Sequence, residues 1–170
     1  HTFGLAILSR FSFNKFYHNF LPNLYPWLNP RKRAAIRASI QTPGGRINII
    51  NAHLSLFKLE RRKQVKTLLG KNWLSAVPKD EPVILCGDFN AGPLSKTYRT
   101  LSRFLTDVQK DNKNLRPSVS QPTFHSRSPL FRIDHIFVSR HFRTLNVEVT
   151  RTLDTQTASD HLPLMADLAM

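Results

Sequence analysis

The pattern of apolar and polar positions predicts strands interleaved with helices. Residues 82–87 are apolar throughout, as is typical of a central strand covered on both faces. Residues 57–74 instead repeat apolar side chains every three or four positions, with basic side chains over much of the remaining surface. This spacing indicates an amphipathic helix. Its repeating apolar positions are Val65, Leu68, Leu69 and Trp73.

Several further short segments have the apolar or alternating pattern of strands. Turn residues at 43–45 join two of them into a hairpin, and Ser95 is a suitable N-cap for a short helix over 95–104. Residues 110–122 are polar and are interpreted as a loop. Helices and strands therefore alternate in an α/β or α+β protein, and the absence of a repeat or linker predicts a single domain over residues 1–170. The predicted strands cover residues 4–9, 34–41, 46–52, 132–138, 143–150 and 162–169.

Residues 11–30 are rich in aromatic side chains, which lie among asparagines and prolines. Pro22, Pro26 and Pro30 argue against one continuous helix, so we interpret this segment as a long aromatic loop. Two roles are open for it. The loop packs beside the sheet, or it forms an aromatic and basic surface, together with Arg31-Lys32-Arg33, that contacts bases or lipid headgroups.

Basic residues far outnumber acidic ones, with 25 Lys and Arg against 11 Asp and Glu and a formal charge of +14. This excess favours polyanionic partners, which are nucleic acid, an anionic membrane or a phosphorylated substrate. Nucleic acid is the first expectation and an anionic phospholipid surface the second. No feature of the sequence indicates a protein partner.

Three features of the sequence bear on the cellular compartment of the protein. Cys86 is the single cysteine, which excludes an internal disulfide framework, and its apolar surroundings indicate a core residue. This cysteine and the absence of a visible signal peptide favour the cytoplasm. The chain begins with His1, however, and reaches an apolar run at residues 5–8 almost at once, so we expect that an upstream segment is missing.

Two polar segments follow predicted strands, where sheet proteins tend to bind ligands. His53 ends the strand over 46–52, where it can donate to a phosphate oxygen or protonate a leaving group; a structural histidine is the alternative. Asp88 and Asn90 follow the buried strand. Asp can accept a proton from water and Asn can orient that water, although the same pair also suits an Asx turn that caps backbone groups.

Two further segments carry carboxylates beside histidines. Asp134 interrupts an alternating strand, and a charge there needs a partner; a histidine or a salt bridge to Arg132 would serve. Asp160 and His161 are adjacent, just before the last predicted strand. In a turn their side chains can diverge, so Asp160 could bind a hard cation such as Mg²⁺ while His161 meets a phosphate.

Taken together and in this order, these motifs resemble the endonuclease/exonuclease/phosphatase superfamily of DNase I-like enzymes. The opening segment 4–10 is similar to the family's Gly-x-Ala-Ile-Leu-Ser-Arg strand, and residues 60–64 are similar to an Arg-containing family segment. The likeness spans residues 4 to 168. It implies a four-layer sandwich, in which two mixed β-sheets lie face to face with helices outside. It also implies a metal-dependent hydrolase that cleaves P–O bonds by in-line attack of activated water.

The resemblance also assigns roles to single residues. Asp88 and Asn90 look like the pair that activates water and orients the phosphate, and His161 would contact the scissile phosphate with Asp134 as its hydrogen-bond partner. Asp160 would belong to a Mg²⁺ site, in which Mn²⁺ is a possible substitute. The remaining phosphate-side or substrate-binding residues would be His53, Asn90 and Arg61.

One departure from the family pattern concerns the metal. The family has an early strand that ends in Asn and a second that ends in Gln-Glu, whose Glu is its principal Mg²⁺ ligand, and neither motif lies upstream of Gly4 here. We therefore expect the chain by itself to bind Mg²⁺ weakly, to show little activity and to expose a sheet edge that promotes association. The function expected of the whole protein is a Mg²⁺-dependent nuclease. A phosphodiesterase acting on a phospholipid or small phosphoester is the first alternative, and a non-catalytic binding module of the same fold is the second.

Overall fold

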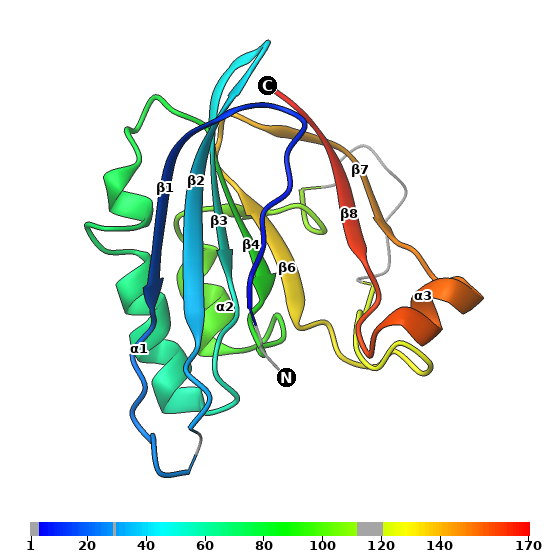
Figure 1. Cartoon of the computed structure of the whole chain (residues 1–170). Helices are drawn as coiled ribbons and strands as arrows, with labels where there is room; N and C mark the ends of the chain where they lie inside the picture. The colour runs from blue at the N-terminus through cyan, green and yellow to red at the C-terminus, as the bar shows by residue number, and fades with distance from the viewer. Residues whose placement is uncertain (1–3, 29, 112–120) are drawn as a thin grey trace.

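A six-stranded mixed sheet forms the centre of the fold, in the order β1-β2-β3-β4-β6-β5 (Figure 1). The computed structural model describes residues 4–28, 30–111 and 121–170. The β3–β4 pair is parallel, and the other pairs of this sheet are antiparallel. Its strands are β1 (Phe13–Phe20), β2 (Ala34–Thr42), β3 (Gly45–Ala52), β4 (Val83–Asp88), β5 (Thr106–Asp107) and β6 (Asp134–Val138).

Helices cover one face of this sheet. They are α1 (Lys58–Leu68), which lies in the crossover between the parallel strands β3 and β4, the 3₁₀-helix η1 (Leu74–Ala76) and α2 (Lys96–Leu101). The main core lies between these helices and the sheet, and Trp73, Leu85 and Phe137 are among its members. Cys86 in β4, expected in the core, is half-buried and belongs to neither apolar cluster of the described residues, although burial raises the pKa of its thiol to about 11.

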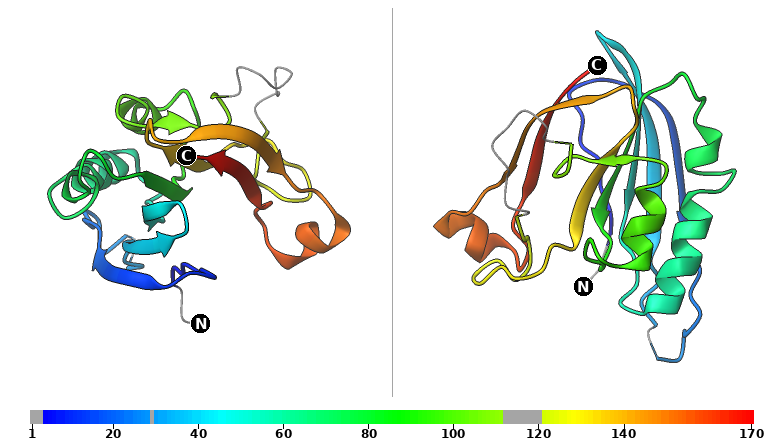
Figure 2. Two further views of the ribbon diagram at one scale, coloured as in Figure 1. Left: turned by 90° about the horizontal axis from the view of Figure 1, so that it is seen from above. Right: turned by 180° about the vertical axis from the view of Figure 1, so that it is seen from behind.

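A smaller antiparallel sheet lies beside the other face, as Figure 2 shows from above. Its strands are β7 (Arg143–Val149) and β8 (Leu164–Ala169), and α3 (Leu153–Ala158) lies between them in the chain. A second apolar cluster around Val108, Val138 and Phe142 joins the two sheets. The expected fold class is therefore confirmed as a mixed α+β protein with a large mixed sheet and a smaller one. None of the helices in the described ranges is long and apolar enough to cross a membrane.

The N-terminal third differs from the prediction in two places. Residues 13–20 form β1 at the edge of the sheet, paired with β2, and only the part after Phe20 is a loop. The prolines that argue against a helix all follow this strand, so they say nothing against an extended one. Residues 4–9, expected to form a strand, take part in no ladder of the described residues; an apolar run forms a strand only where a neighbour offers backbone partners.

The remaining differences concern short or polar elements. The helix predicted over 57–74 ends at Leu68, residues 69–73 form turns and a bend, and the 3₁₀-helix η1 begins only at Leu74. Both β5 and α3 were missed, because β5 has two residues and α3 buries none of its side chains. Most of the loop predicted over 110–122 lies outside the described residues. The other predicted strands, the hairpin turn and the helix capped by Ser95 are confirmed.

Candidate active site

A pocket of about 560 Å³ opens at the carboxyl ends of β3 and β4, at the edge of the sheet where the sequence placed its polar segments. Six of the seven predicted site residues line it, although they come from four separate parts of the chain. The basic run after the aromatic loop forms another part of the wall. The predicted residues that line the pocket are His53, Asp88, Asn90, Asp134, Asp160 and His161, and the basic ones are Arg31, Lys32 and Arg33.

A close approach of two backbones brings the first pair of these residues together. Gly87 has φ +129°, and a Cβ on it would lie 2.0 Å from the carbonyl oxygen of Ala52. Only glycine can therefore occupy this position. As a result, His53 after β3 and Asp88 at the end of β4 lie side by side, with 3.2 Å between Nε2 and Oδ2.

Asp88 and Asn90 form the Asx turn that was the structural alternative, and they also face the pocket. The backbone N–H of Asn90 donates to Oδ1 of Asp88 at 2.8 Å, and its Nδ2 donates to Oδ2 at 3.1 Å and to the carbonyl of Leu54 at 2.9 Å. Asn90 adopts a left-handed φ of +46°, which Asn tolerates better than most residues. The turn fixes the carboxylate in place without removing it from the pocket.

The net effect of this environment is to lower the pKa of Asp88. Burial alone would raise the pKa, but the hydrogen bonds from the His53 ring and the Asn90 backbone, with the charges of both histidines, outweigh it. Asp88 is therefore an anion at neutral pH, which is the state that can accept a proton from water.

Arg33 is a member of this cluster that the sequence did not single out. Its Nη1 lies 2.5 Å from Nε2 and 3.1 Å from Nδ1 of His53, and burial is the first cause that lowers its pKa, opposed by the charge of Asp88. The only signal in the sequence was its place in a basic run. A guanidinium, an imidazole and a carboxylate are thus contiguous along one wall of the pocket.

Asp134 and His161 form a second carboxylate–histidine pair beside the first, because Asp134 is the cross-strand partner of Asp88 in the β4–β6 ladder. Nδ1 of His161 lies 2.7 Å from Oδ2 of Asp134, and the Thr123 hydroxyl donates to the same oxygen at 2.5 Å. The hydrogen bond that the His161 ring donates to Asp134 raises the pKa of His161, despite the opposing effect of burial. The alternative partner, Arg132, is instead paired with buried Asp107.

Two other predicted residues, Arg61 and Asp160, belong to neither carboxylate–histidine pair. Arg61 is buried and does not line the pocket; its Nη1 donates to the carbonyls of Ser55 and Leu56 at 2.9 and 2.7 Å. It holds the loop that follows His53. Asp160 is exposed and lines the pocket, and its carbonyl accepts from the backbone of Ser126.

The donors in the pocket suit a metal ion only in part. Carboxylates suit hard cations, and three of them line the pocket. Asp88 and Asp134 are each held by a histidine, however, and within the described ranges no group of three or more His, Cys, Asp or Glu side chains is placed to hold a metal ion. These residues therefore do not form a complete metal site by themselves, and Asp160 supplies a single free-standing carboxylate.

Comparisons with known proteins concern the family and the fold of this chain. The profile of the Endonuclease/Exonuclease/phosphatase family matches residues 1–161. The uncharacterized protein YbhP of Escherichia coli K12 is 28% identical over 142 residues, which cover 81% of this chain and 53% of YbhP. The chain thus spans about half the length of the curated relatives that it matches.

Solved structures show the same fold. An endonuclease/exonuclease/phosphatase from Bacteroides vulgatus has a TM-score of 0.77 at 20% identity, over 94% of this chain and 66% of that one. The mannosyl-6-phosphatase Bt3783 of Bacteroides thetaiotaomicron has a TM-score of 0.76 at 22% identity, over 94% and 67%. The catalytic domain of human Nocturnin has a TM-score of 0.69 at 21% identity, over 94% and 60%.

Proposed function

Because the chain belongs to the endonuclease/exonuclease/phosphatase family, we propose that its pocket hydrolyses a phosphoester bond by attack of an activated water. One observation carries the proposal. Two carboxylate–histidine pairs, His53–Asp88 and Asp134–His161, line a single pocket from the adjacent strands β4 and β6, with basic side chains beside them. An isolated Asx turn or salt bridge would need neither the second pair nor the shared cavity.

Asp88 is the base in this proposal. Its lowered pKa keeps it ionised, and the two hydrogen bonds from Asn90 hold its carboxylate in one orientation. It takes a proton from the water that attacks phosphorus. Asn90 also orients the phosphate, and the neighbouring His53 and Arg33 contact phosphate oxygens on the same side.

His161 stabilises the charge that develops on the phosphate. A hydrogen bond to Asp134 through Nδ1 favours the protonated ring, and Nε2 is then a charged donor for an oxygen of the scissile phosphate. Asp134 acts through His161, because it fixes the orientation of the ring and raises its pKa. The buried hydroxyl of Thr123 holds Asp134 in turn.

The cofactor and the substrate are further parts of the proposal. Dependence on Mg²⁺, with Mn²⁺ as a substitute and Asp160 as a ligand, stays a prediction because the described donors do not complete a site. For the substrate, the net charge of +14 favours nucleic acid. The names of similar structures include both a sugar phosphatase and a 2′,3′-cyclic phosphatase, so small phosphoesters belong in the test.

The test is hydrolysis by the protein with its full natural sequence. Supercoiled plasmid, RNA, phospholipid vesicles and small phosphate monoesters are presented in parallel with Mg²⁺ and with EDTA. We expect turnover of one class, lost in Asp88→Asn and kept in the control Asp80→Asn, which changes an exposed loop carboxylate. Turnover that survives Asp88→Asn would contradict the assigned base. No turnover by a folded, metal-supplied protein would favour the non-catalytic binding module.

A further inference from the structure

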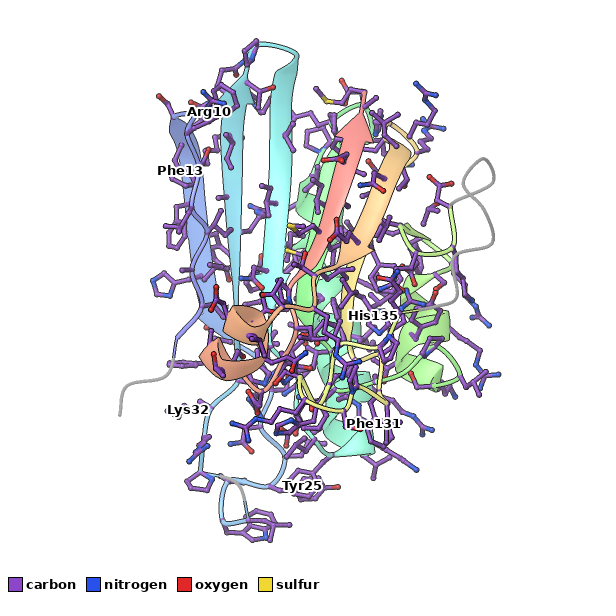
Figure 3. All side chains as sticks on the ribbon, turned by 90° about the vertical axis from the view of Figure 1, so that its right-hand side faces the viewer. Arg10, Phe13, Tyr25, Lys32, Phe131 and His135 are labelled. Carbon is purple, nitrogen blue, oxygen red and sulfur yellow. The ribbon has the colours of Figure 1, made fainter. Side chains whose placement is uncertain are left out.

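The catalytic pocket lies between two apolar hollows. The first lies between the loop after β1 and the start of α1, and the second lies beside the segment after β4. Leu56 lines both the catalytic pocket and the first hollow, and Ile133 lines both the catalytic pocket and the second. The three hollows therefore form one continuous surface. Figure 3 shows Tyr25 and Phe131, from the two apolar hollows, at the same end of the molecule.

This surface exposes large apolar side chains that belong to neither apolar cluster of the described core, and exposed Trp27 adjoins it through an edge contact with the Tyr25 ring of the first hollow. These exposed side chains are defined here as the apolar rim, and their exposed fractions reach 80% for Trp27 and 91% for Leu94. Scattered exposed leucines are ordinary, whereas a group around a pocket marks an interaction site. The members of the apolar rim are Trp27, Leu28, Leu56, Leu59, Leu94, Leu130 and Phe131.

The part of the apolar rim around Trp27 is held in place. Glu60 and Gln64 of α1 are both buried; Glu60 accepts from the backbone of Leu24 at 2.9 Å, and Gln64 donates to the carbonyl of Pro22 at 3.0 Å. These two bonds fix the loop from the side of the helix. A loop that is anchored by buried polar groups cannot fold its apolar tip inward, so the tip is presented to whatever lies outside.

Basic side chains accompany the apolar ones. Arg31 and Lys32 line the catalytic pocket and are exposed, and Lys58 is the charged residue of the first hollow. Arg62 follows one turn later on α1 and is also exposed. The combination of aromatic, aliphatic and basic side chains is typical of surfaces that enter the headgroup region of anionic bilayers.

From this arrangement we infer that the apolar rim docks on an anionic phospholipid surface, with the catalytic pocket facing the bilayer. The aliphatic side chains of the apolar rim favour lipid over nucleic acid as the partner that binds the rim. Bases stack on aromatic rings, but Leu28, Leu56, Leu94 and Leu130 gain little from a polyanion and much from leaving water. The inference rests on the proposed function only in placing a lipid phosphate within reach of the pocket; docking itself needs no catalysis.

Vesicle flotation in the presence of EDTA tests docking without turnover. Vesicles of phosphatidylcholine alone are compared with vesicles of phosphatidylcholine and phosphatidylglycerol in equal parts. The variants are Trp27→Ala in the apolar rim, Lys58→Gln among its basic neighbours, and the control Phe13→Ala. Phe13 is an exposed aromatic residue at the opposite end of the molecule (Figure 3).

We expect the wild type and Phe13→Ala to float with the anionic vesicles and to bind neutral vesicles more weakly. Trp27→Ala should weaken partitioning about tenfold, and Lys58→Gln should weaken it about threefold on anionic vesicles only. Absence of flotation, or equal losses in Trp27→Ala and Phe13→Ala, would overturn the inference. Salt-sensitive binding to single-stranded DNA or RNA without vesicle binding would also overturn it, in favour of nucleic acid. If the wild type floats with vesicles but hydrolyses no substrate, the proposed function is refuted and the docking inference stands.

Discussion

The close approach at Gly87 connects the fold to the site, and replacing this glycine with alanine tests that connection. Real Cβ atoms do not approach other heavy atoms within 3.0 Å, whereas this one would lie 2.0 Å from the Ala52 carbonyl oxygen. β3 and β4 would have to separate locally by about 1 Å, a consequence of the steric limit on the backbone. That movement disturbs the bond from Leu54 N–H to the Asp88 carbonyl, 2.9 Å long, and it shifts His53 away from Asp88.

Gly45→Ala is the matched control. Gly45 has a similar φ of +120° in the hairpin turn, but a Cβ there meets nothing within 4 Å. Both variants incur the strain of this backbone region, about 1–3 kcal/mol. Gly87→Ala also weakens backbone hydrogen bonds, worth about 1 kcal/mol each, so its total cost should reach about 3–5 kcal/mol.

Urea unfolding measures the difference. The two costs differ by about 2 kcal/mol, so with a slope of about 1–3 kcal/mol per molar urea the midpoint of Gly87→Ala should fall by about 0.7–2 M more than that of Gly45→Ala. Hydrolysis under native conditions should fall only in Gly87→Ala, because the distance between His53 and Asp88 changes only there. Equal midpoints for the two variants would show that the clash is relieved without moving the strands, and would refute the reasoning.

Three further predictions concern hydrogen bonds and titration. Asp134→Asn should lower the pKa of His161, seen by NMR titration of the ring, and should move the alkaline limb of activity to lower pH. Folding raises the pKa of His161, so the Asp134–His161 pair stabilises the protein below the unfolded pKa, and this stabilisation is lost as pH rises through the folded pKa. Asp134→Asn should therefore lower the urea midpoint at mildly acidic pH, and an unchanged midpoint would contradict the prediction. The Asp88 pKa is lowered, so Asp88 stabilises the protein above its unfolded pKa, and Asp88→Asn should flatten the loss of stability on acidification, measured by denaturation across pH. Glu60→Ala should leave Leu24 N–H without its acceptor, cost about 1–3 kcal/mol and speed protease cleavage of the loop; unchanged cleavage would show that the loop is held by other contacts.

The sequence was most informative where polar residues directly follow predicted strands. A buried strand followed by Gly87 and Asp88 predicts a carboxylate at a sheet edge, because glycine permits the turn and the strand fixes the direction. The alternation of apolar positions likewise placed most of the sheet and the main helices. The order of the polar motifs pointed to the family, since these segments occur together for one kind of chemistry.

The tertiary structure decided which residues are partners. His161 lies 27 positions from Asp134, and Arg33 lies 20 positions from His53; no local pattern states such pairings. β1 needed β2 beside it to become a strand, because an edge strand is stabilised by backbone bonds to a neighbour rather than by its own composition. The sequence by itself therefore determined the groups, their order and the sheet that carries them. Folding alone decided the distances on which charge, pKa and catalysis depend, because electrostatic interactions fall with separation in space and not along the chain.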